Sequence, residues 1–232
     1  MYKTIIVYCI ISLLFSYTNL YGNIYTNFNK TENELYQSGY SLFVNKKYLQ
    51  VIQLYQNMES IYPGTYYTLQ IQLLSSISSY KTGQYAHAIS NIENYIYKCN
   101  IRNNINIPYV YYLRILFYYM HIHNIKFGQE TAYKTLEFAR TYIELFLDSK
   151  YLNEVQQIEK RVINHIAYSE YSIGKFYLQH GKYLSSIICF QNILKKYKNS
   201  DYYSKVIKNL IIAYSALGLY QEAYYCQNDI LY

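Results

Sequence analysis

The chain has 232 residues, and its hydrophobic fraction of 52% excludes an intrinsically disordered protein. Its 8 glycines and 2 prolines are too few for a β-sandwich, which needs many tight turns. The formal net charge of +7, from 21 basic and 14 acidic residues, would suit an anionic partner or a membrane surface. The lysines are scattered, however, and no nucleic-acid-binding motif accompanies them, so we expect solvated helix faces and no nucleic-acid partner.

Residues 1–21 have the pattern of a signal peptide or N-terminal anchor. Lys3 gives a positive start, and residues 4–15 form an apolar run that is shorter than the roughly 20 residues of a bilayer span. Polar residues follow, and cleavage after Thr18 would fit them. A buried first helix is the alternative interpretation. Residues 22–32 are mostly polar, and we expect a flexible lead-in there.

Cys9 lies within this apolar run and is a candidate for lipid attachment. In bacterial lipoproteins the modified cysteine follows a small residue at the end of the run, whereas Cys9 follows Tyr8 and lies inside it. Lipidation at Cys9 and cleavage after Thr18 are therefore alternative fates of the segment.

Apolar residues at helical spacing then alternate with turn signals along the chain. The expected helices are 33–44, 48–61, 66–81, 85–98, 109–119, 131–147, 151–179, 183–197, 203–217 and 220–230. Pro63 ends the second of them, and Pro108 suits the first turn of the fifth. We expect an Asn-rich loop at 99–106 and a linker at 121–128.

A repeat is visible at the turns between paired helices. Gly83, Gly181 and Gly218 each precede a tyrosine by two residues, and glycine adopts the positive φ of a tight helical turn without strain. Tyr85 follows Tyr48 by 37 residues, which is the spacing of helix-pair repeats. The pattern predicts an all-α, tetratricopeptide-like superhelical array of about five helix pairs.

Side chains that could perform catalysis are not arranged in any motif. The sequence has no P-loop, Gly-x-Gly-x-x-Gly, His-Glu-x-x-His or Gly-x-Ser-x-Gly, so we expect neither an enzyme nor a cofactor. His121 and His123 lie on different helix faces and would need two more ligands to hold zinc, so we expect no metal. Cys189 and Cys226 occupy equivalent repeat positions, too far apart for a disulfide, and we expect free thiols.

Five short segments, in their order and spacing, resemble the BamD family of outer-membrane assembly lipoproteins, and the resemblance covers most of 33–230. They are Tyr62-Pro63, Tyr67-Thr68, 70–73 (Gln-Ile-Gln-Leu), 109–114 (Tyr-Val-Tyr-Tyr-Leu-Arg) and 167–172 (Ala-Tyr-Ser-Glu-Tyr-Ser). The sequence departs from the family at Cys9, in a shorter segment after Arg114, and at Lys198, where the family has proline.

The resemblance implies a non-enzymatic scaffold of the outer-membrane β-barrel assembly machinery. It implies a place on the periplasmic face of the outer membrane, with the barrel insertase BamA and other assembly lipoproteins as partners. It also implies contact with unfolded outer-membrane protein segments, because stacked helix pairs form grooves in which extended peptides dock. The alternative is a generic exported tetratricopeptide adaptor of another envelope or secretion complex.

We expect residues 33–147 to form the substrate groove. The candidate groove residues lie on the first helices of the second and third repeats: Tyr67, Gln70, Tyr109, Tyr112 and Arg114. Arg114 would pair with the terminal carboxylate of a peptide. The alternative is that Arg114 braces two helices and that the tyrosines belong to the core.

We expect residues 148–232 to bind the insertase. No polar capping helix follows the last repeat, and an uncovered apolar face suits a partner. Lysines that could steer an acidic partner cluster near the preceding turn: Lys195, Lys196, Lys198, Lys205 and Lys208. The alternative is a frayed terminal helix with solvated lysines.

Overall fold

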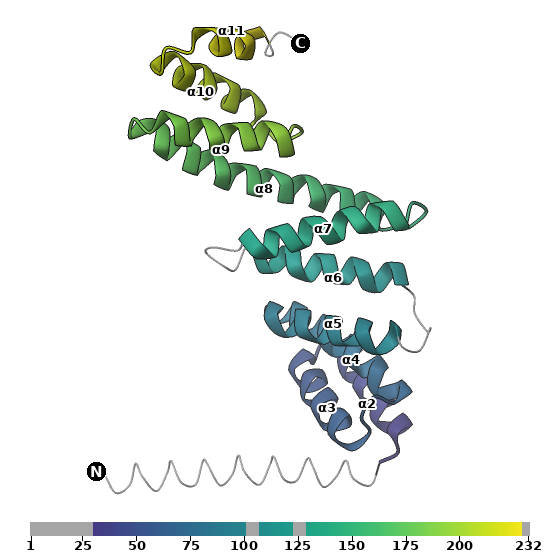
Figure 1. Ribbon diagram of the computed structural model, residues 1–232. Helices are drawn as coiled ribbons and strands as arrows, with labels where there is room; N and C mark the ends of the chain where they lie inside the picture. The colour runs from purple at the N-terminus through teal and green to yellow at the C-terminus, as the bar shows by residue number, and fades with distance from the viewer. Residues whose placement is uncertain (1–29, 101–106, 123–128, 229–232) are drawn as a thin grey trace, which may run out of the picture. The chain divides into compact units, whose positions relative to one another are not determined.

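The computed structural model describes residues 30–100, 107–122 and 129–228, and these contain ten α-helices and no β-strand (Figure 1). The helices are α2 (Glu32–Val44), α3 (Tyr48–Ile61), α4 (Tyr66–Lys81), α5 (Tyr85–Asn100), α6 (Ile107–Ile122), α7 (Gln129–Leu145), α8 (Leu152–Gln179), α9 (Tyr183–Lys196), α10 (Tyr203–Ala216) and α11 (Tyr220–Asn228). The prediction of an all-α array of helix pairs is confirmed. The expected signal segment, Cys9 and most of the lead-in lie outside the described residues.

Two helices extend beyond their predicted ends. α5 continues to Asn100, so the predicted loop at 99–106 begins with helical residues. α6 continues to Ile122, so the predicted linker at 121–128 also begins inside a helix. The reason is burial, because the side chains of Cys99 and Ile122 are only 4% and 3% exposed. In the sequence, polar residues flank both Cys99 and Ile122, so their burial was not predicted.

Four helix pairs turn in the same way. After α4, the N–H of Gln84 donates to the carbonyl of Ser79 at 2.8 Å, across Gly83 with φ +76°. This is the Schellman arrangement, in which a left-handed residue lets two N–H groups cap the last carbonyls of a helix. Gly181 and Gly218 repeat it with φ +70° and +74°. Lys46, with φ +58°, takes the glycine's place after α2.

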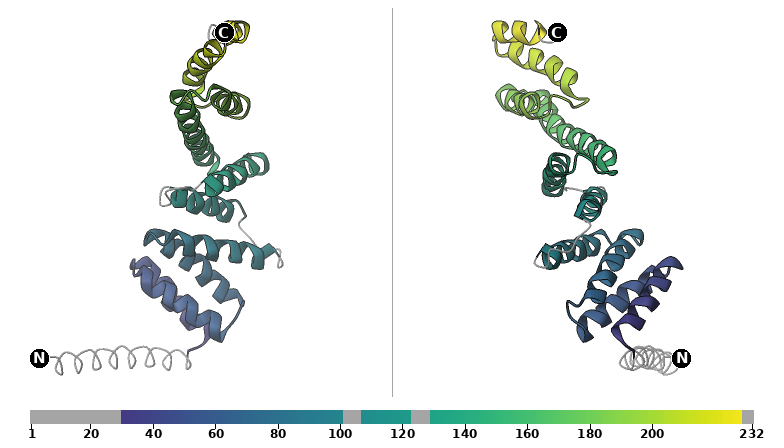
Figure 2. Two further views of the ribbon diagram at one scale, coloured as in Figure 1. Left: turned by 60° about the vertical axis from the view of Figure 1, so that its left-hand side comes forward. Right: turned by 90° about the vertical axis from the view of Figure 1, so that its right-hand side faces the viewer.

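The described residues form two compact units, α2–α5 and α6–α11. In each unit the helices of a pair lie side by side (Figures 1 and 2). The predicted boundary at 147/148 divides the chain by expected function. The compact units of the structure instead have their boundary in the chain near residue 105. The functional division therefore stays a prediction.

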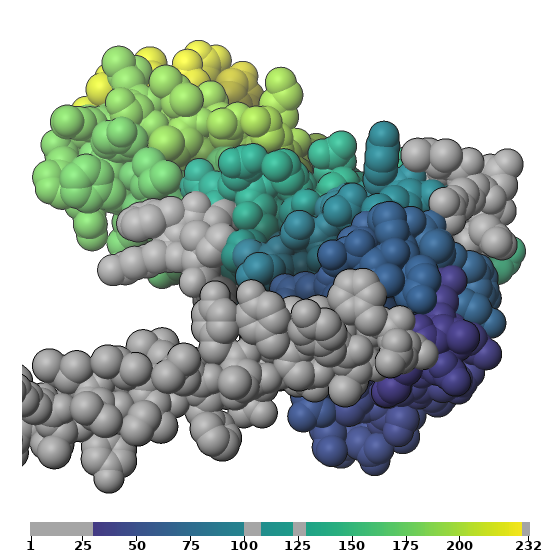
Figure 3. All heavy atoms as spheres, turned by 90° about the horizontal axis from the view of Figure 1, so that it is seen from below, coloured from purple at the N-terminus to yellow at the C-terminus, as the bar shows by residue number. Residues whose placement is uncertain are grey.

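The first unit has an apolar cluster between α2, α3 and α4. Leu35, Met58 and Ile71 are its most buried members. α2 and α3 lie together on the face that Figure 3 presents, in purple and blue. Glu32, at the start of α2, also caps α4, because its Oε1 accepts hydrogen bonds from the N–H groups of Tyr67 and Thr68 at 3.1 and 3.3 Å.

α4 buries polar side chains among its neighbours α2, α3 and α5. Six of them have no exposed surface: Thr68, Gln72, Ser75, Ser76, Ser78 and Ser79. Gln72 donates to the carbonyl oxygen of Asn91 at 3.2 Å, and Asn91 donates to the hydroxyl of Ser75 at 3.4 Å. These bonds satisfy the Gln72 amide N–H and the Ser75 hydroxyl, which would be costly to bury alone.

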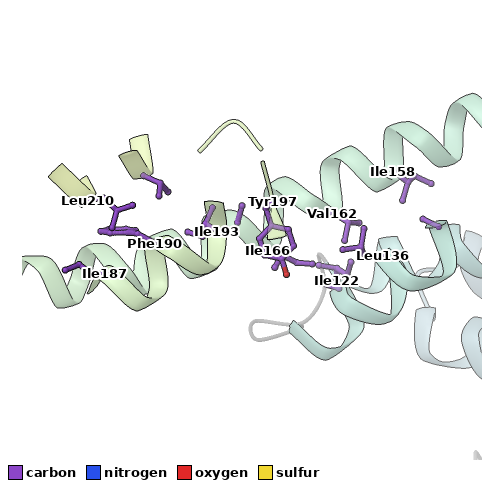
Figure 4. Close-up of a cluster of buried hydrophobic side chains, with 14 of the residues drawn as sticks. Ile122, Leu136, Ile158, Val162, Ile166, Ile187, Phe190, Ile193, Tyr197 and Leu210 are labelled. Carbon is purple, nitrogen blue, oxygen red and sulfur yellow. The ribbon is translucent and has the colours of Figure 1, made fainter. Parts of the chain in front are cut away.

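The second unit has the larger core, which runs through all six helices. Figure 4 shows part of it, from Ile122 and Leu136 at one end to Ile187 and Leu210 at the other. α8 connects these contacts because its 28 residues span about 42 Å at 1.5 Å a residue. It packs on both α7 and α9, and Arg140 Nε on α7 donates to Glu159 at 3.3 Å.

Candidate functional site

The predicted groove residues are divided between the two units. Tyr67 and Gln70 lie on α4 in the first unit, whereas Tyr109, Tyr112 and Arg114 lie on α6 in the second. All five side chains are half-buried. The two sets therefore belong to separate surroundings, one in each unit.

In the first unit, Tyr67 lies in an aromatic group. Its ring centroid is 5.3 Å from that of Tyr36 on α2 and 5.4 Å from that of Tyr66. Tyr40 continues the row, 6.5 Å from Tyr36, and is half exposed. These rings form a stacking surface along one edge of α2 and α4. The side chains of an extended peptide can pack on such a surface.

In the second unit, Tyr109 and Tyr112 both contact Tyr151, which directly precedes α8. Tyr112 stacks on Tyr151 with a centroid distance of 4.5 Å and an interplanar angle of 8°. Tyr109 lies 5.6 Å from Tyr151, and burial raises the pKa of its phenol. These two rings join the third helix pair to the fourth, so much of their surface is used inside the protein.

Arg114 lies between two aromatic rings. Its guanidinium carbon is 4.6 Å from the centroid of Tyr111 and 3.8 Å from that of Phe138 on α7. Cation–π contacts of this kind contribute about 0.5–2 kcal/mol. Arg114 thus holds α6 to α7, which is the role that the structural alternative assigned to it. Binding of a peptide carboxylate by Arg114 stays a prediction.

The predicted lysine cluster is exposed as a whole. Lys195 and Lys196 end α9, Lys198 follows in the turn, and Lys205 and Lys208 lie on α10. The ammonium of Lys205 lies 4.9 Å from the ring centroid of Tyr202. Partner binding by these lysines is a prediction that depends on their charge alone.

A cavity of about 540 Å³ lies between α7 and the end of α9 and was not predicted. Lys196 and Glu137 line it, together with Arg140 and the rings of Tyr133 and Tyr197. Burial raises the pKa of Tyr197, and the hydroxyl of Tyr133 donates to Glu170 at 3.2 Å. The lining mixes both charges, and no sequence motif marks it.

Helix α11 exposes aromatic side chains. Tyr220, Tyr224 and Tyr225 on α11 are 72%, 62% and 61% exposed, and Ala223 is the buried residue of that helix. Exposed amphipathic surface of this kind is suited to a partner.

The described residues contain three cysteines. Within the described residues, Cys99, Cys189 and Cys226 form no disulfide bond. Within 30–100, 107–122 and 129–228, no group of three or more His, Cys, Asp or Glu side chains could hold a metal. His123 lies outside these ranges. Of the helices described, none combines the length and the apolarity that crossing a membrane requires.

Comparison with known proteins gives a family and two named relatives. BamD, the outer membrane protein assembly factor of Rickettsia prowazekii (strain Madrid E), is 28% identical over 190 residues, which are 82% of this chain and 74% of that protein. BamD of Caulobacter vibrioides is 24% identical over 144 residues, 62% of this chain and 47% of that protein. The TPR2AB domain of yeast Sti1, solved in a complex with pHSP90, matches 85% of this chain and 75% of that one with a TM-score of 0.48 and 13% identity. Because the YfiO family, described as outer membrane lipoproteins, matches residues 28–228, the chain belongs to that family.

Proposed function

We propose that this protein is a non-catalytic scaffold in the assembly of outer-membrane β-barrel proteins. The observation that carries the proposal is the YfiO family match over 28–228, together with two relatives that are named assembly factors. An array of helix pairs supports this role, because such arrays hold other proteins on extended surfaces.

The proposed partner is a BamA-like barrel insertase, held by the second unit. Exposed rings on α11 and the five lysines around the α9–α10 turn would supply the contact and the charge. Positive groups at an interface rim chiefly speed the encounter with an acidic partner. Other assembly lipoproteins would share the complex on the periplasmic face of the outer membrane.

The proposed clients are unfolded segments of outer-membrane proteins. The aromatic group of Tyr36, Tyr40 and Tyr67 offers one docking surface in the first unit. An extended segment can lay alternate side chains on such rings. Arg114 and the tyrosines of α6 would contribute in the second unit where their surfaces stay exposed.

The test is to isolate the protein from its own membranes through an affinity tag. We expect the barrel insertase to co-purify, and we expect depletion of the protein to lower the amount of folded outer-membrane barrels. Recovery of a different envelope complex, with barrel levels unchanged after depletion, would contradict the proposal. A tagged protein with Ala223→Glu, which places a charge at the buried position of α11, is the control for disruption of that helix.

A further inference from the structure

A second cavity, of about 400 Å³, lies entirely within the second unit, between α6, α8 and the turn that leads into α10. Its walls include three tyrosine rings, one from each of these elements: Tyr119, Tyr168 and Tyr202. Tyr168 is 55% exposed and lies 5.6 Å from the ring of Tyr202. The buried side chains of Ile122 and Val162 also line the cavity and belong to the core that Figure 4 shows. The cavity is thus an aromatic recess on a rigid base.

Basic side chains stand at the rim of this recess. Arg161 and His165, both exposed, lie four residues apart on α8 and therefore on the same face of that helix. Lys205 on α10 adds a positive charge beside the recess, because its ammonium lies over the ring of Tyr202. The recess is consequently bordered by cations on the α8 and α10 sides.

The acidic side chains near the recess have hydrogen-bond partners within the protein, and one of them, Asp201, lies in the recess wall. Asp201, which also lines it, accepts a hydrogen bond from Asn164 Nδ2 at 2.7 Å, and its N–H donates to Asn164 Oδ1 at 2.9 Å. On α8, Glu159 bonds Arg140 and Glu170 accepts from Tyr133, and both of these partners belong to α7. Neither α6 nor α10 contains an Asp or a Glu. Arg161 and Lys205 carry two positive charges against the single negative charge of Asp201, so the rim is net positive and suits an anionic side chain.

We propose that this recess binds an extended peptide that inserts an apolar or aromatic side chain between the tyrosines and places an acidic side chain, two residues away, on Arg161. Residues two apart in an extended chain point to the same side and are roughly 6.5–7 Å apart, which suits a ring in the recess and a carboxylate at its rim. A guanidinium binds a carboxylate through two parallel hydrogen bonds. The inference rests on the proposed function, since unfolded client segments supply such peptides, but it places them at α6, α8 and α10.

The test measures binding of short fluorescent peptides to the full-length chain. The probe peptide is acetylated and amidated, so its Glu is the source of carboxylate, and it carries Phe two residues from that Glu. We expect replacement of Glu by Gln, or a shift of Phe to the adjacent position, to weaken binding about tenfold. A second peptide lacks the Glu but has a free C-terminal carboxylate, so it distinguishes a side-chain carboxylate from a terminal one. Tighter binding of this peptide than of the Glu probe would overturn the proposal.

Variants of the protein locate the site. Arg161→Glu should weaken binding of the Glu peptide about tenfold or more, whereas Lys160→Glu, the same charge change on the neighbouring exposed residue, should leave it nearly unchanged. Tyr168→Ala should weaken binding of the Phe peptide, and Tyr224→Ala on α11 should not. Equal losses in Arg161→Glu and Lys160→Glu would show unspecific charge attraction and would overturn the proposal. Co-purification of the insertase is independent of these results, so the two failures are distinguishable.

Discussion

Gly174 on α8 lies against the ring of Phe190 on α9, so closely that a Cβ atom at Gly174 would be 2.6 Å from Phe190 Cε1. Phe190 has no exposed surface, and its ring is fixed by the core of the second unit. The same Cβ would be 3.1 Å from the Cβ of Cys189. Gly174 thus sets how closely α8 and α9 approach.

We therefore predict that Gly174→Ala destabilises the protein. Alanine in place of a helical glycine gains about 0.5–1 kcal/mol in helix propensity, but overpacking a rigid core costs about 1–3 kcal/mol. The free energy of unfolding, measured with urea, should fall by roughly 1–2 kcal/mol.

Gly39→Ala is the matched comparison. Its Cβ would meet Ile71 Cδ1 at 2.4 Å and Leu54 Cδ2 at 2.9 Å, and these are ends of flexible side chains that can turn aside. We expect a smaller loss than for Gly174→Ala. The reverse order would show that the core of the first unit is the more rigid one.

The position of Arg114 between Tyr111 and Phe138 gives a second prediction. Arg114→Ala removes both the cation and its aliphatic stem, and we expect a loss of about 1–2 kcal/mol in the free energy of unfolding. Arg114→Met keeps the stem and should lose less.

The methionine variant also separates the two roles of Arg114. If Arg114 holds a peptide carboxylate, Arg114→Met should remain folded and bind peptides from barrel C-termini more weakly. Undiminished binding would remove Arg114 from the predicted groove and leave it as a brace between α6 and α7.

The third prediction concerns alkaline pH. Burial, followed by the nearby negative charge of Glu59, raises the pKa of Tyr55 to about 12. An ordinary tyrosine in the unfolded chain titrates near pH 10, so above that pH the folded chain keeps a proton that the unfolded chain releases. This contribution to stability is complete below about pH 10 and is lost as the pH rises toward about 12.

Tyr55→Phe should therefore lose stability less steeply than the parent over that window, while the two proteins are similar near pH 8. Urea unfolding at a series of pH values measures the slope. Burial also raises the pKa of Tyr95, so the slope should be reduced without disappearing. An unchanged slope would mean that Tyr55 titrates with an ordinary pKa.

The fold could be predicted because its helix ends and turns are marked by residues at the turns themselves. Gly83, Gly181 and Gly218 occupy the left-handed position after three helices, a conformation that few other residues adopt readily. Lys46 takes the same conformation after α2, and the sequence indicates that turn through Tyr48, 37 residues before Tyr85. Helix starts and ends therefore agreed with the pattern to within a few residues.

The buried polar face of α4 could not be predicted in the same way. Serines at helical spacing resemble a solvated face, and periodicity cannot distinguish a hydroxyl in water from one bonded inside the core. Ser76 and Ser78 donate to the carbonyls of Leu73 and Leu74, both at 2.7 Å, which satisfies them locally. Only the packing of the neighbouring helices shows that these side chains are covered.

The candidate sites were the least predictable part, since they depend on residues far apart in the chain. The ring of Tyr112 stacks on Tyr151 from the start of the next helix pair, and its contact with a client stays a prediction. The recess at Tyr119, Tyr168 and Tyr202 combines three elements whose apposition follows from how the repeats stack. No local pattern specifies such an apposition.

The last prediction tests the lysines around the α9–α10 turn. Lys195 and Lys196 are in the last turn of α9, where positive charge favours the helix, so reversing them would cost about 0.3–1 kcal/mol each in addition to any effect on binding. Lys205 is in the first turn of α10, where negative charge is favoured, and Lys208 lies beyond that turn. The double variant Lys205→Glu/Lys208→Glu should therefore stay as stable as the parent.

If these lysines steer an acidic insertase, that double variant should slow association with the purified insertase by about tenfold at low salt and leave dissociation nearly unchanged. The difference from the parent should shrink as salt rises, because screening removes the steering. Lys160→Glu/Lys175→Glu, which makes the same charge change at two exposed positions on α8, is the control and should slow association less. Equal slowing by both pairs would mean that the net charge of the protein, rather than the α9–α10 turn, governs the encounter.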